Sequence, residues 1–283
     1  NNVYFFDKDS STPEWSYNAG DDIEAASISA DGEYIAVTGC GGPESCIYLF
    51  DKDSSTPIWS YETDDDNRFL KTIVISSDGG NIAAGTTSGL IYYWNRESST
   101  PLWIHDTGSG EIRDLSMSAD GKYIVAAAGE YVYLFGDTNN TLWEYEAEDE
   151  VYAVEISADG EYIITGDDDE TIYFFNKDSN DPIWDYEPDG KPKSVDISSD
   201  GEYMVVSTSS KIYVFDKDSS TPLWSYSSGN KLVGISEDGE YVFSTASTFS
   251  LWDRASSTLL WSYATTGLDQ GSGFELDSSA SGR

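Results

Sequence analysis

The sequence predicts an all-β protein, a seven-bladed β-propeller of four-stranded antiparallel blades, and three observations lead to this fold class. A unit of roughly forty residues repeats along the chain, turn signals recur at short even intervals, and no segment has helical periodicity. Four strands per repeat favour a propeller over the two rival folds, a β-helix and a pair of sandwiches. We therefore expect a single propeller domain over residues 1–283.

The clearest marker of the repeat is one tryptophan in each unit. Successive copies are separated by 37 residues (Trp224 to Trp261) to 44 residues (Trp15 to Trp59). This spacing is close to the length of one four-stranded blade. The seven equivalent positions are Trp15, Trp59, Trp103, Trp143, Trp184, Trp224 and Trp261.

Each unit is predicted to contain four strands in a fixed order. In the first complete unit, apolar and polar residues alternate over 25–29, and Asp31-Gly32 turns the chain into a second strand over 33–37. An Asp-Gly pair supplies the positive φ that tight hairpin turns need. A third strand covers 47–50, and a polar loop leads to a fourth over 58–61. The pair recurs at Asp78-Gly79, Asp120-Gly121, Asp159-Gly160, Asp200-Gly201 and Asp238-Gly239.

The third strand is apolar on both faces, as Ile47-Tyr48-Leu49-Phe50 illustrates. A strand needs this only where both sides of its sheet are covered. The pattern therefore predicts that each sheet lies between neighbouring sheets.

The repeat also predicts where each blade begins and ends. Residues 1–18 supply the outer strands of a closing blade, and residues 263–283 supply its inner strand, expected over 273–278. The last blade is thus shared between the N- and C-terminal segments. No segment of the sequence is left to supply the second strand of this blade. We therefore expect the chain to be part of a longer protein. The six full blades are predicted over 22–62, 69–106, 111–146, 151–187, 193–226 and 231–262.

Two segments resemble known propeller repeats. Residues 156–175, with Ser157-Ala158-Asp159-Gly160 followed by two strands, resemble a WD-repeat unit. Leu251-Trp252-Asp253 contains the Trp-Asp pair of that family, although its Gly-His pair is missing throughout. Residues 216–226 resemble the tryptophan-docking unit of quinoprotein-like propellers, of the kind found in archaeal-type microbial surface proteins. This resemblance implies that the seven equivalent tryptophans are structural and pack between blades.

The resemblance does not extend to a known activity. Quinone-dependent dehydrogenases of the quinoprotein family have eight blades and a vicinal disulfide beside a metal-bound cofactor. This chain has about seven units and no adjacent cysteines, so that activity is not expected here.

The charge is strongly negative and excludes several classes of partner. The chain contains 52 acidic and 15 basic residues, which gives a net charge of −37. Such a surface repels the phosphates of nucleic acid and of anionic lipid headgroups. No stretch has the roughly 20 apolar residues needed to span a membrane. Three interpretations stay open: a solvated surface that maintains solubility, adaptation to high salt, or an exported surface that collects calcium.

Few residues of the sequence are candidates for a catalytic role. His105 is the only histidine, and it stands where other units have tyrosine. Carboxylates are abundant, but nothing distinguishes an acid and base pair, and a pair in the central channel would be the place to look. We therefore expect the protein not to be an enzyme.

Acidic loops are weak candidates for calcium ligands, and calcium is the one cofactor considered. The residues are Asp64, Asp65, Asp66, Asp167, Asp168, Asp169 and Glu170. On the opposite face, loops such as Asp51-Lys52-Asp53 lack the glycine and distal glutamate of a calcium loop. We expect Asx turns there instead. Asn139-Asn140-Thr141 is a lone glycosylation sequon.

Cys40 and Cys46 are the only cysteines and flank a Gly-Gly-Pro loop. They are predicted to form a small disulfide, which would imply an oxidising compartment, and the alternative is two reduced thiols.

The function predicted from these features is that of a non-catalytic interaction or scaffold domain of a secreted or cell-surface protein. Its partner would be a protein or another cell-surface component, with a basic partner favoured by the charge. A calcium-dependent protein that binds or acts on carbohydrate is one alternative, and a structural subunit of a surface layer or filament is another.

Overall fold

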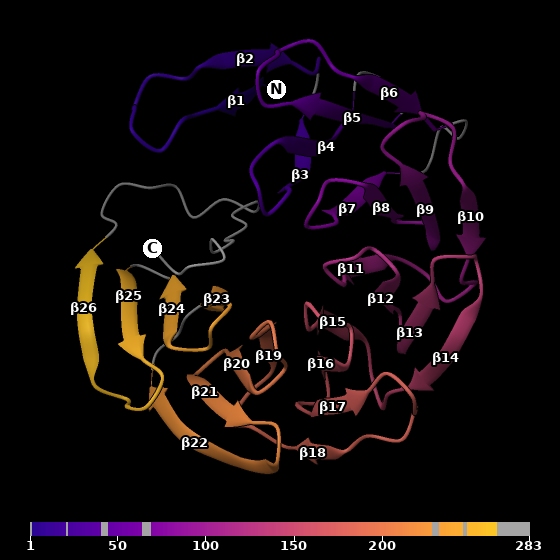
Figure 1. The fold of residues 1–283 in the computed structure, drawn as a ribbon. Coiled ribbons are helices and arrows are strands. Elements are labelled where there is room, and N and C mark those ends of the chain that lie inside the picture. The colour runs from indigo at the N-terminus through magenta and orange to yellow at the C-terminus, as the bar shows by residue number, and fades with distance from the viewer. Residues whose placement is uncertain are drawn as a thin grey trace. The chain divides into compact units, whose positions relative to one another are not determined.

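The computed structural model describes residues 2–20, 22–40, 45–63, 69–227, 232–245 and 248–264, apart from the side chains of Cys40 and Ser45. These residues form strands and no helix, so none of them belongs to a helix that could cross a membrane. The strands pair into one two-stranded sheet and six four-stranded antiparallel sheets (Figure 1).

The strand bounds follow the chain sheet by sheet. The two-stranded sheet consists of β1 (Asn2–Phe5) and β2 (Trp15–Asn18). The next two sheets are β3 (Ile23–Ile28), β4 (Tyr34–Cys40), β5 (Ser45–Asp51) and β6 (Trp59–Glu62), then β7 (Leu70–Ile75), β8 (Asn81–Thr86), β9 (Leu90–Asn95) and β10 (Trp103–Asp106). The fourth and fifth are β11 (Ile112–Met117), β12 (Tyr123–Ala128), β13 (Tyr131–Gly136) and β14 (Thr141–Glu146), then β15 (Val151–Ile156), β16 (Tyr162–Asp167), β17 (Ile172–Asn176) and β18 (Trp184–Tyr186). The last two are β19 (Pro192–Ile197), β20 (Tyr203–Thr208), β21 (Lys211–Asp216) and β22 (Ser219–Ser227), then β23 (Leu232–Ile235), β24 (Tyr241–Thr245), β25 (Thr248–Asp253) and β26 (Leu259–Ala264).

The predicted fold class is confirmed. Every four-stranded sheet takes its strands in sequence order, which is the sheet of a propeller blade, and β1 with β2 supplies part of a seventh. The six sheets coincide with the six predicted units. The chain divides into two compact units, 1–115 and 116–283, so the single-domain prediction stays a prediction. The inner strand expected over 273–278 lies outside the described residues.

The six predicted Asp-Gly turns are confirmed, and a serine that was not predicted completes each one. Gly32 has a φ of 72°, and the other five glycines also have positive φ. In the first turn the buried Ser29 hydroxyl donates to Asp31 (2.6 Å) and accepts the N–H of Tyr34 (3.0 Å). The Ser29 hydroxyl and the N–H of Glu33 hold the pKa of Asp31 below its ordinary value. The same pair of bonds recurs at Ser76, Ser118, Ser157, Ser198 and Ser236.

Four third strands, over residues 91–94, 132–135, 172–175 and 212–215, are buried on both faces, as predicted, and none of these residues is more than 5% exposed. The burial is less complete in β5 and β25, where Tyr48, Phe249 and Leu251 are half-buried. In β1 the prediction fails, since Tyr4 is 53% exposed. Within residues 1–115, β3 and β4 contact β7, and within 116–283, β15 and β16 contact β19. Within each unit, the cores therefore lie between successive sheets, where one sheet covers a face of the next.

Several equivalent tryptophans connect one sheet to the next. Each indole N–H donates to a backbone carbonyl 30 to 37 residues further along the chain. The pairs are Trp15 with Lys52, Trp59 with Arg96, Trp143 with Lys177, Trp184 with Lys217 and Trp224 with Arg254, at 2.6 to 3.0 Å. Trp103 stacks on Tyr93 at 4.9 Å, and Trp261 is 52% exposed.

Two further tryptophans at the end of the third strand give a matched stability test. Trp94 and Trp252 are both fully buried, but only the Trp94 indole has a hydrogen bond, to Ser99 O at 3.1 Å. The Trp252 N–H has no hydrogen-bond partner among the residues that the structure describes. Since an unpaired buried donor costs about 1–3 kcal/mol, Trp252→Phe is expected to lose at least 1 kcal/mol less stability than Trp94→Phe. Urea unfolding of both variants measures the difference, and equal losses would contradict the expectation.

Candidate functional site

The weak metal candidates do not converge where the structure describes them. Asp64, Asp65 and Asp66 lie outside the described residues. In the second loop, Asp168 pairs with Lys191 at 2.5 Å, and Glu170 adopts a φ of 64°. Among the described residues, no three Asp, Glu, His or Cys side chains form a group that could hold a metal ion.

Asp167 points inward from the same loop and is fully buried. Its carboxylate accepts the N–H of Thr171 at 2.8 Å and the hydroxyl of Tyr173 at 3.1 Å. Burial nevertheless raises the pKa of Asp167 above its ordinary value, because the charged form is poorly solvated there. Asp167 is therefore part of the hairpin core, and its oxygens are not available as ligands on the surface.

The raised pKa of Asp167 predicts a pH-dependent effect of substitution. A carboxyl whose pKa is higher in the folded state destabilises the fold progressively as the pH rises from the unfolded value through the folded one. Asp167→Asn keeps groups that can bond to Thr171 and Tyr173, so it is expected to increase stability at pH 7 and to lose that gain below about pH 3.8. Asp167→Ala leaves both donors unpaired and is expected to cost about 1–3 kcal/mol. Chemical unfolding at pH 7 and pH 3.5 measures both effects, and a gain for Asp167→Asn that did not depend on pH would contradict the assignment.

The predicted disulfide stays a prediction. In the register of β4 with β5, Cys46 lies opposite Gly39, and Cys40 lies opposite Ser45. The Cys40 side chain is outside the described part of the structure.

Two carboxylates of the first strands, where a channel acid and base pair was to be sought, are engaged with neighbouring strands: those of Glu155 and Asp196. Ser116 on β11 donates to Glu155 on β15 at 2.5 Å and accepts the N–H of Ile156 at 3.2 Å. Asp196 on β19 accepts the N–H of Ile235 on β23 at 2.7 Å. These side chains satisfy backbone groups along the open edge of the adjacent sheet. His105, on β10, lies opposite Ile91 in the register with β9.

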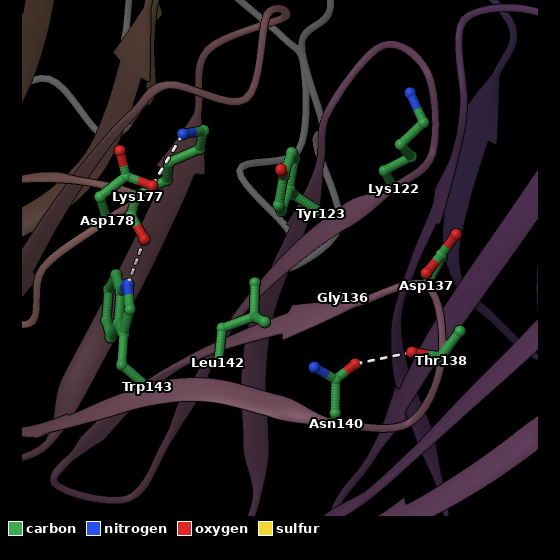
Figure 2. A pocket seen from close by; sticks show the side chains of 10 residues that line it. All are labelled: Lys122, Tyr123, Gly136, Asp137, Thr138, Asn140, Leu142, Trp143, Lys177 and Asp178. Atoms are coloured by element: carbon green, nitrogen blue, oxygen red, sulfur yellow. Dashed lines mark hydrogen bonds and ion pairs between the residues drawn. The ribbon is translucent and has the colours of Figure 1, made fainter.

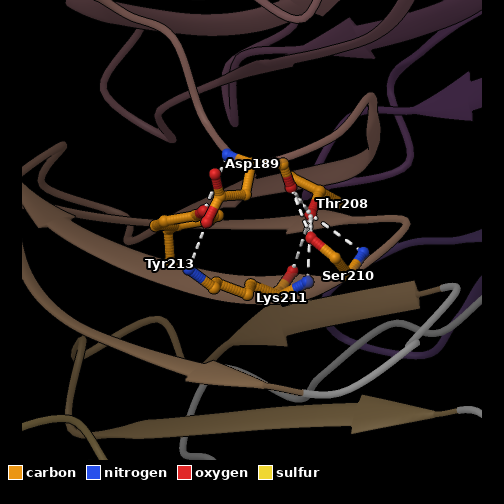
Figure 3. Close-up of polar contacts among 5 residues, drawn as sticks. All are labelled: Asp189, Thr208, Ser210, Lys211 and Tyr213. Atoms are coloured by element: carbon orange, nitrogen blue, oxygen red, sulfur yellow. Dashed lines mark hydrogen bonds and ion pairs between the residues drawn. The ribbon is translucent and has the colours of Figure 1, made fainter.

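A second polar cluster is also structural (Figure 3). The backbone N–H of Asp189 donates to the Tyr213 hydroxyl at 2.8 Å, and its carboxylate pairs with Lys211. The hydroxyls of Thr208 and Ser210 both donate to the Asp189 carbonyl, at 2.8 and 2.5 Å. The cluster fixes the loop between β18 and β19 to the hairpin of β20 and β21.

The loop between β13 and β14 departs from the repeat in a way that changes its surface. In the other six loops, an Asp or Asn at its start accepts the N–H two residues later, at 2.8 to 3.0 Å, which confirms the expected Asx turns. Gly136 stands at this position in the third complete unit, and the loop is one residue shorter than the other six. Asn139, in the sequon, has a φ of 47°.

The charges at this loop are also reversed. Other units place a Lys or Arg after the Asx residue, and three of these lysines pair with the glutamate of the Asp-Gly-Glu turn, as Lys177 does with Glu161 at 3.4 Å. The third complete unit has Asp137 and Lys122 at the two positions. Lys122 bonds Asp120 at 2.5 Å, and this bond, with the charges of Asp120 and Asp137, raises the pKa of Lys122.

These departures open a hollow of about 450 Å³ (Figure 2). It is lined by Lys122, Tyr123, Gly136, Asp137, Thr138, Asn140, Leu142, Trp143, Lys177 and Asp178. Sequence reasoning missed this site because each residue is unremarkable by itself. Alignment of the seven loops position by position would have revealed it, since four of its residues depart from the repeat.

Comparisons with known proteins agree with the fold. A family model described as outer membrane protein assembly factor BamB matches residues 1–186 and, in an overlapping match, residues 43–263. No curated protein matches the chain. A solved chain from the crystal structure of the mitotic checkpoint complex is similar with a TM-score of 0.73, over 86% of this chain and 79% of that chain, at 16% identity. At this identity the likeness shows the fold alone. The resemblance to WD-repeat and quinoprotein-like propellers is confirmed.

Proposed function

The chain belongs to the family described as outer membrane protein assembly factor BamB, and from this membership we propose that it is a non-catalytic binding and scaffold domain of a secreted or cell-surface protein. The site proposed for its partner is the hollow beside the loop over residues 136–141, together with the exposed Leu142.

One observation carries this proposal: the third complete unit departs from the repeat at a loop where the other units agree. Residues that form the Asx turns, the Ser-Asp turns and the tryptophan bonds recur because every unit needs them to fold. A change that leaves the sheet intact but alters the shape and charge of one loop serves no such need. Exposed loops on a rigid scaffold are where binding residues gather.

Two further features support the proposal that the domain is non-catalytic and that it belongs to a secreted or cell-surface protein. The carboxylates described above are committed to backbone and side-chain partners, and the family description names an assembly factor, which is a binding role. A net charge of −37 suits a surface that faces salt-rich surroundings, because screening there reduces self-repulsion.

Site-specific photo-cross-linking on intact source cells tests the proposal. A benzophenone amino acid replaces Leu142, which is 43% exposed, or Leu223, which occupies the same place in a regular unit and is 47% exposed. We expect one discrete cross-linked product on the cell exterior from position 142 and none from position 223. Equal labelling from both positions, or none from either, would refute the proposed site.

A further inference from the structure

We propose that the hollow beside Gly136 is a carbohydrate-binding subsite that recognises a pyranose ring without a metal ion. The inference rests on the proposed function, because it names the chemical class of the cell-surface component that this site contacts. It is argued from the origin of the hollow, its lining and the charge around it.

The hollow borders a position where the sequence removes a side chain. At the position of Gly136, six other loops carry an Asp or Asn whose side-chain oxygen accepts the N–H two residues later. A Cβ at Gly136 would lie 3.0 Å from Oδ1 of Asn140, at the end of that side chain. Gly136→Asp therefore adds a side chain at the border of the hollow, against Asn140.

One part of the lining is apolar. Leu142 and the rings of Tyr123 and Trp143 border the hollow, and Figure 2 shows Leu142 between the tryptophan and Asn140. The Trp143 indole N–H is held by Lys177 O at 2.8 Å, and its ring lies 5.4 Å from that of Phe175. The aromatic surface is thus fixed before a ligand arrives, which lowers the entropic cost of binding.

The other part of the lining offers hydrogen-bonding groups. The Asn140 Oδ1 accepts the Thr138 hydroxyl at 2.8 Å, and Figure 2 shows the amide nitrogen on the side that faces Leu142. The amide can donate there, and Asp137 and Tyr123, which also line the hollow, carry a carboxylate and a hydroxyl. A ligand that fits must combine an apolar face with several hydroxyl groups.

Charge selects among such ligands. The two ammonium groups of Lys122 and Lys177 and the two carboxylates of Asp137 and Asp178 balance within the lining, so the hollow is neutral. Lys177 pairs with Asp178 at 2.8 Å. An anion would have to approach a protein of net charge −37, and a cation would find unpaired carboxylates at many other places. A neutral pyranose meets neither obstacle, since its C–H face can lie on the aromatic rings while its hydroxyls bond the rim.

Ligand-observed NMR with the whole chain tests the inference. The probes are methyl glycosides of glucose, galactose, mannose and N-acetylglucosamine at up to 10 mM, in EDTA. We expect saturation transfer to at least one glycoside with the unaltered protein, and at least a tenfold weaker affinity for Gly136→Asp. This variant restores the residue of the repeat and fills the hollow, and Asp216→Ala, at the same position of a regular unit, is the control that keeps binding.

Each result decides the inference. Absence of transfer to any of the four glycosides, or binding that Gly136→Asp leaves unchanged, would overturn it. Thermal unfolding of Gly136→Asp checks that the variant is folded, and Asn140→Ala provides a second variant that should weaken binding if it is not. Photo-cross-linking from position 142 that no glycoside reduces would leave the proposed function standing and reject the carbohydrate.

Discussion

Replacement of Gly201 by alanine is expected to lower the free energy of unfolding by about 2–4 kcal/mol, the largest loss among the single turn substitutions considered. Gly201 has a φ of 69°, which costs an alanine roughly 1–2 kcal/mol. An added Cβ would also lie 2.4 Å from Cδ2 of Tyr162, in the preceding sheet. Tyr162 stacks on Phe174 with ring centroids 5.5 Å apart, so it cannot move without disturbing the core.

Gly32 provides the matched control for Gly201. Its φ of 72° is nearly the same, but a Cβ there would meet nothing within 4 Å. Gly32→Ala is therefore expected to cost only the backbone term, about 1–2 kcal/mol. Urea unfolding of the two variants separates the backbone strain of a positive φ from the steric contact with Tyr162. A double-mutant cycle of Gly201→Ala with Tyr162→Ala should show a coupling energy between the two positions. Equal losses at both glycines would contradict the role assigned to Tyr162.

The same pair of glycines shows what a sequence can and cannot predict. Asp-Gly predicts a turn with positive φ because that property is local, and all six turns have it. The contact of Gly201 with Tyr162 joins residues 39 positions apart in different sheets, and no local rule contains it. The repeat period, the strand order and the buried third strands were likewise predictable, because each follows from a pattern within one unit.

The candidate site required the three-dimensional structure for a different reason. Alignment of the seven loops identifies Gly136 as a departure from the repeat, but a sequence records the residues present and not the volume of about 450 Å³ between them. The acidic loop containing Asp167 was a metal candidate because of its composition. Whether its carboxylates point outward or into the hairpin depends on Thr171 N and the Tyr173 hydroxyl, which the composition does not reveal.

The melting temperature is expected to rise steeply with salt, by about 10 °C or more between 0.1 and 4 M NaCl, which corresponds to several kcal/mol for a domain of this size. With 52 acidic and 15 basic residues, repulsive pairs of charges far outnumber attractive ones. The Debye length falls from about 10 Å at 0.1 M to about 3 Å at 1 M, so repulsion between separated carboxylates is screened first. Ion pairs in direct contact, such as Lys52 with Glu33 at 2.9 Å, lose a smaller part of their attraction to screening.

The same measurement in calcium distinguishes general screening from a specific site. If the effect is electrostatic, KCl should match NaCl at equal ionic strength, and millimolar CaCl₂ followed by EDTA should change the melting temperature by less than about 2 °C. A rise of about 10 °C or more in NaCl or KCl, without calcium, would favour a salt-adapted surface over one that is merely solvated. A flat response to salt would contradict the prediction. A large gain that needs calcium and disappears with EDTA would instead assign the metal to carboxylates on the acidic loops, because a ligand that binds only the folded state stabilises it by RT ln(1 + [L]/Kd).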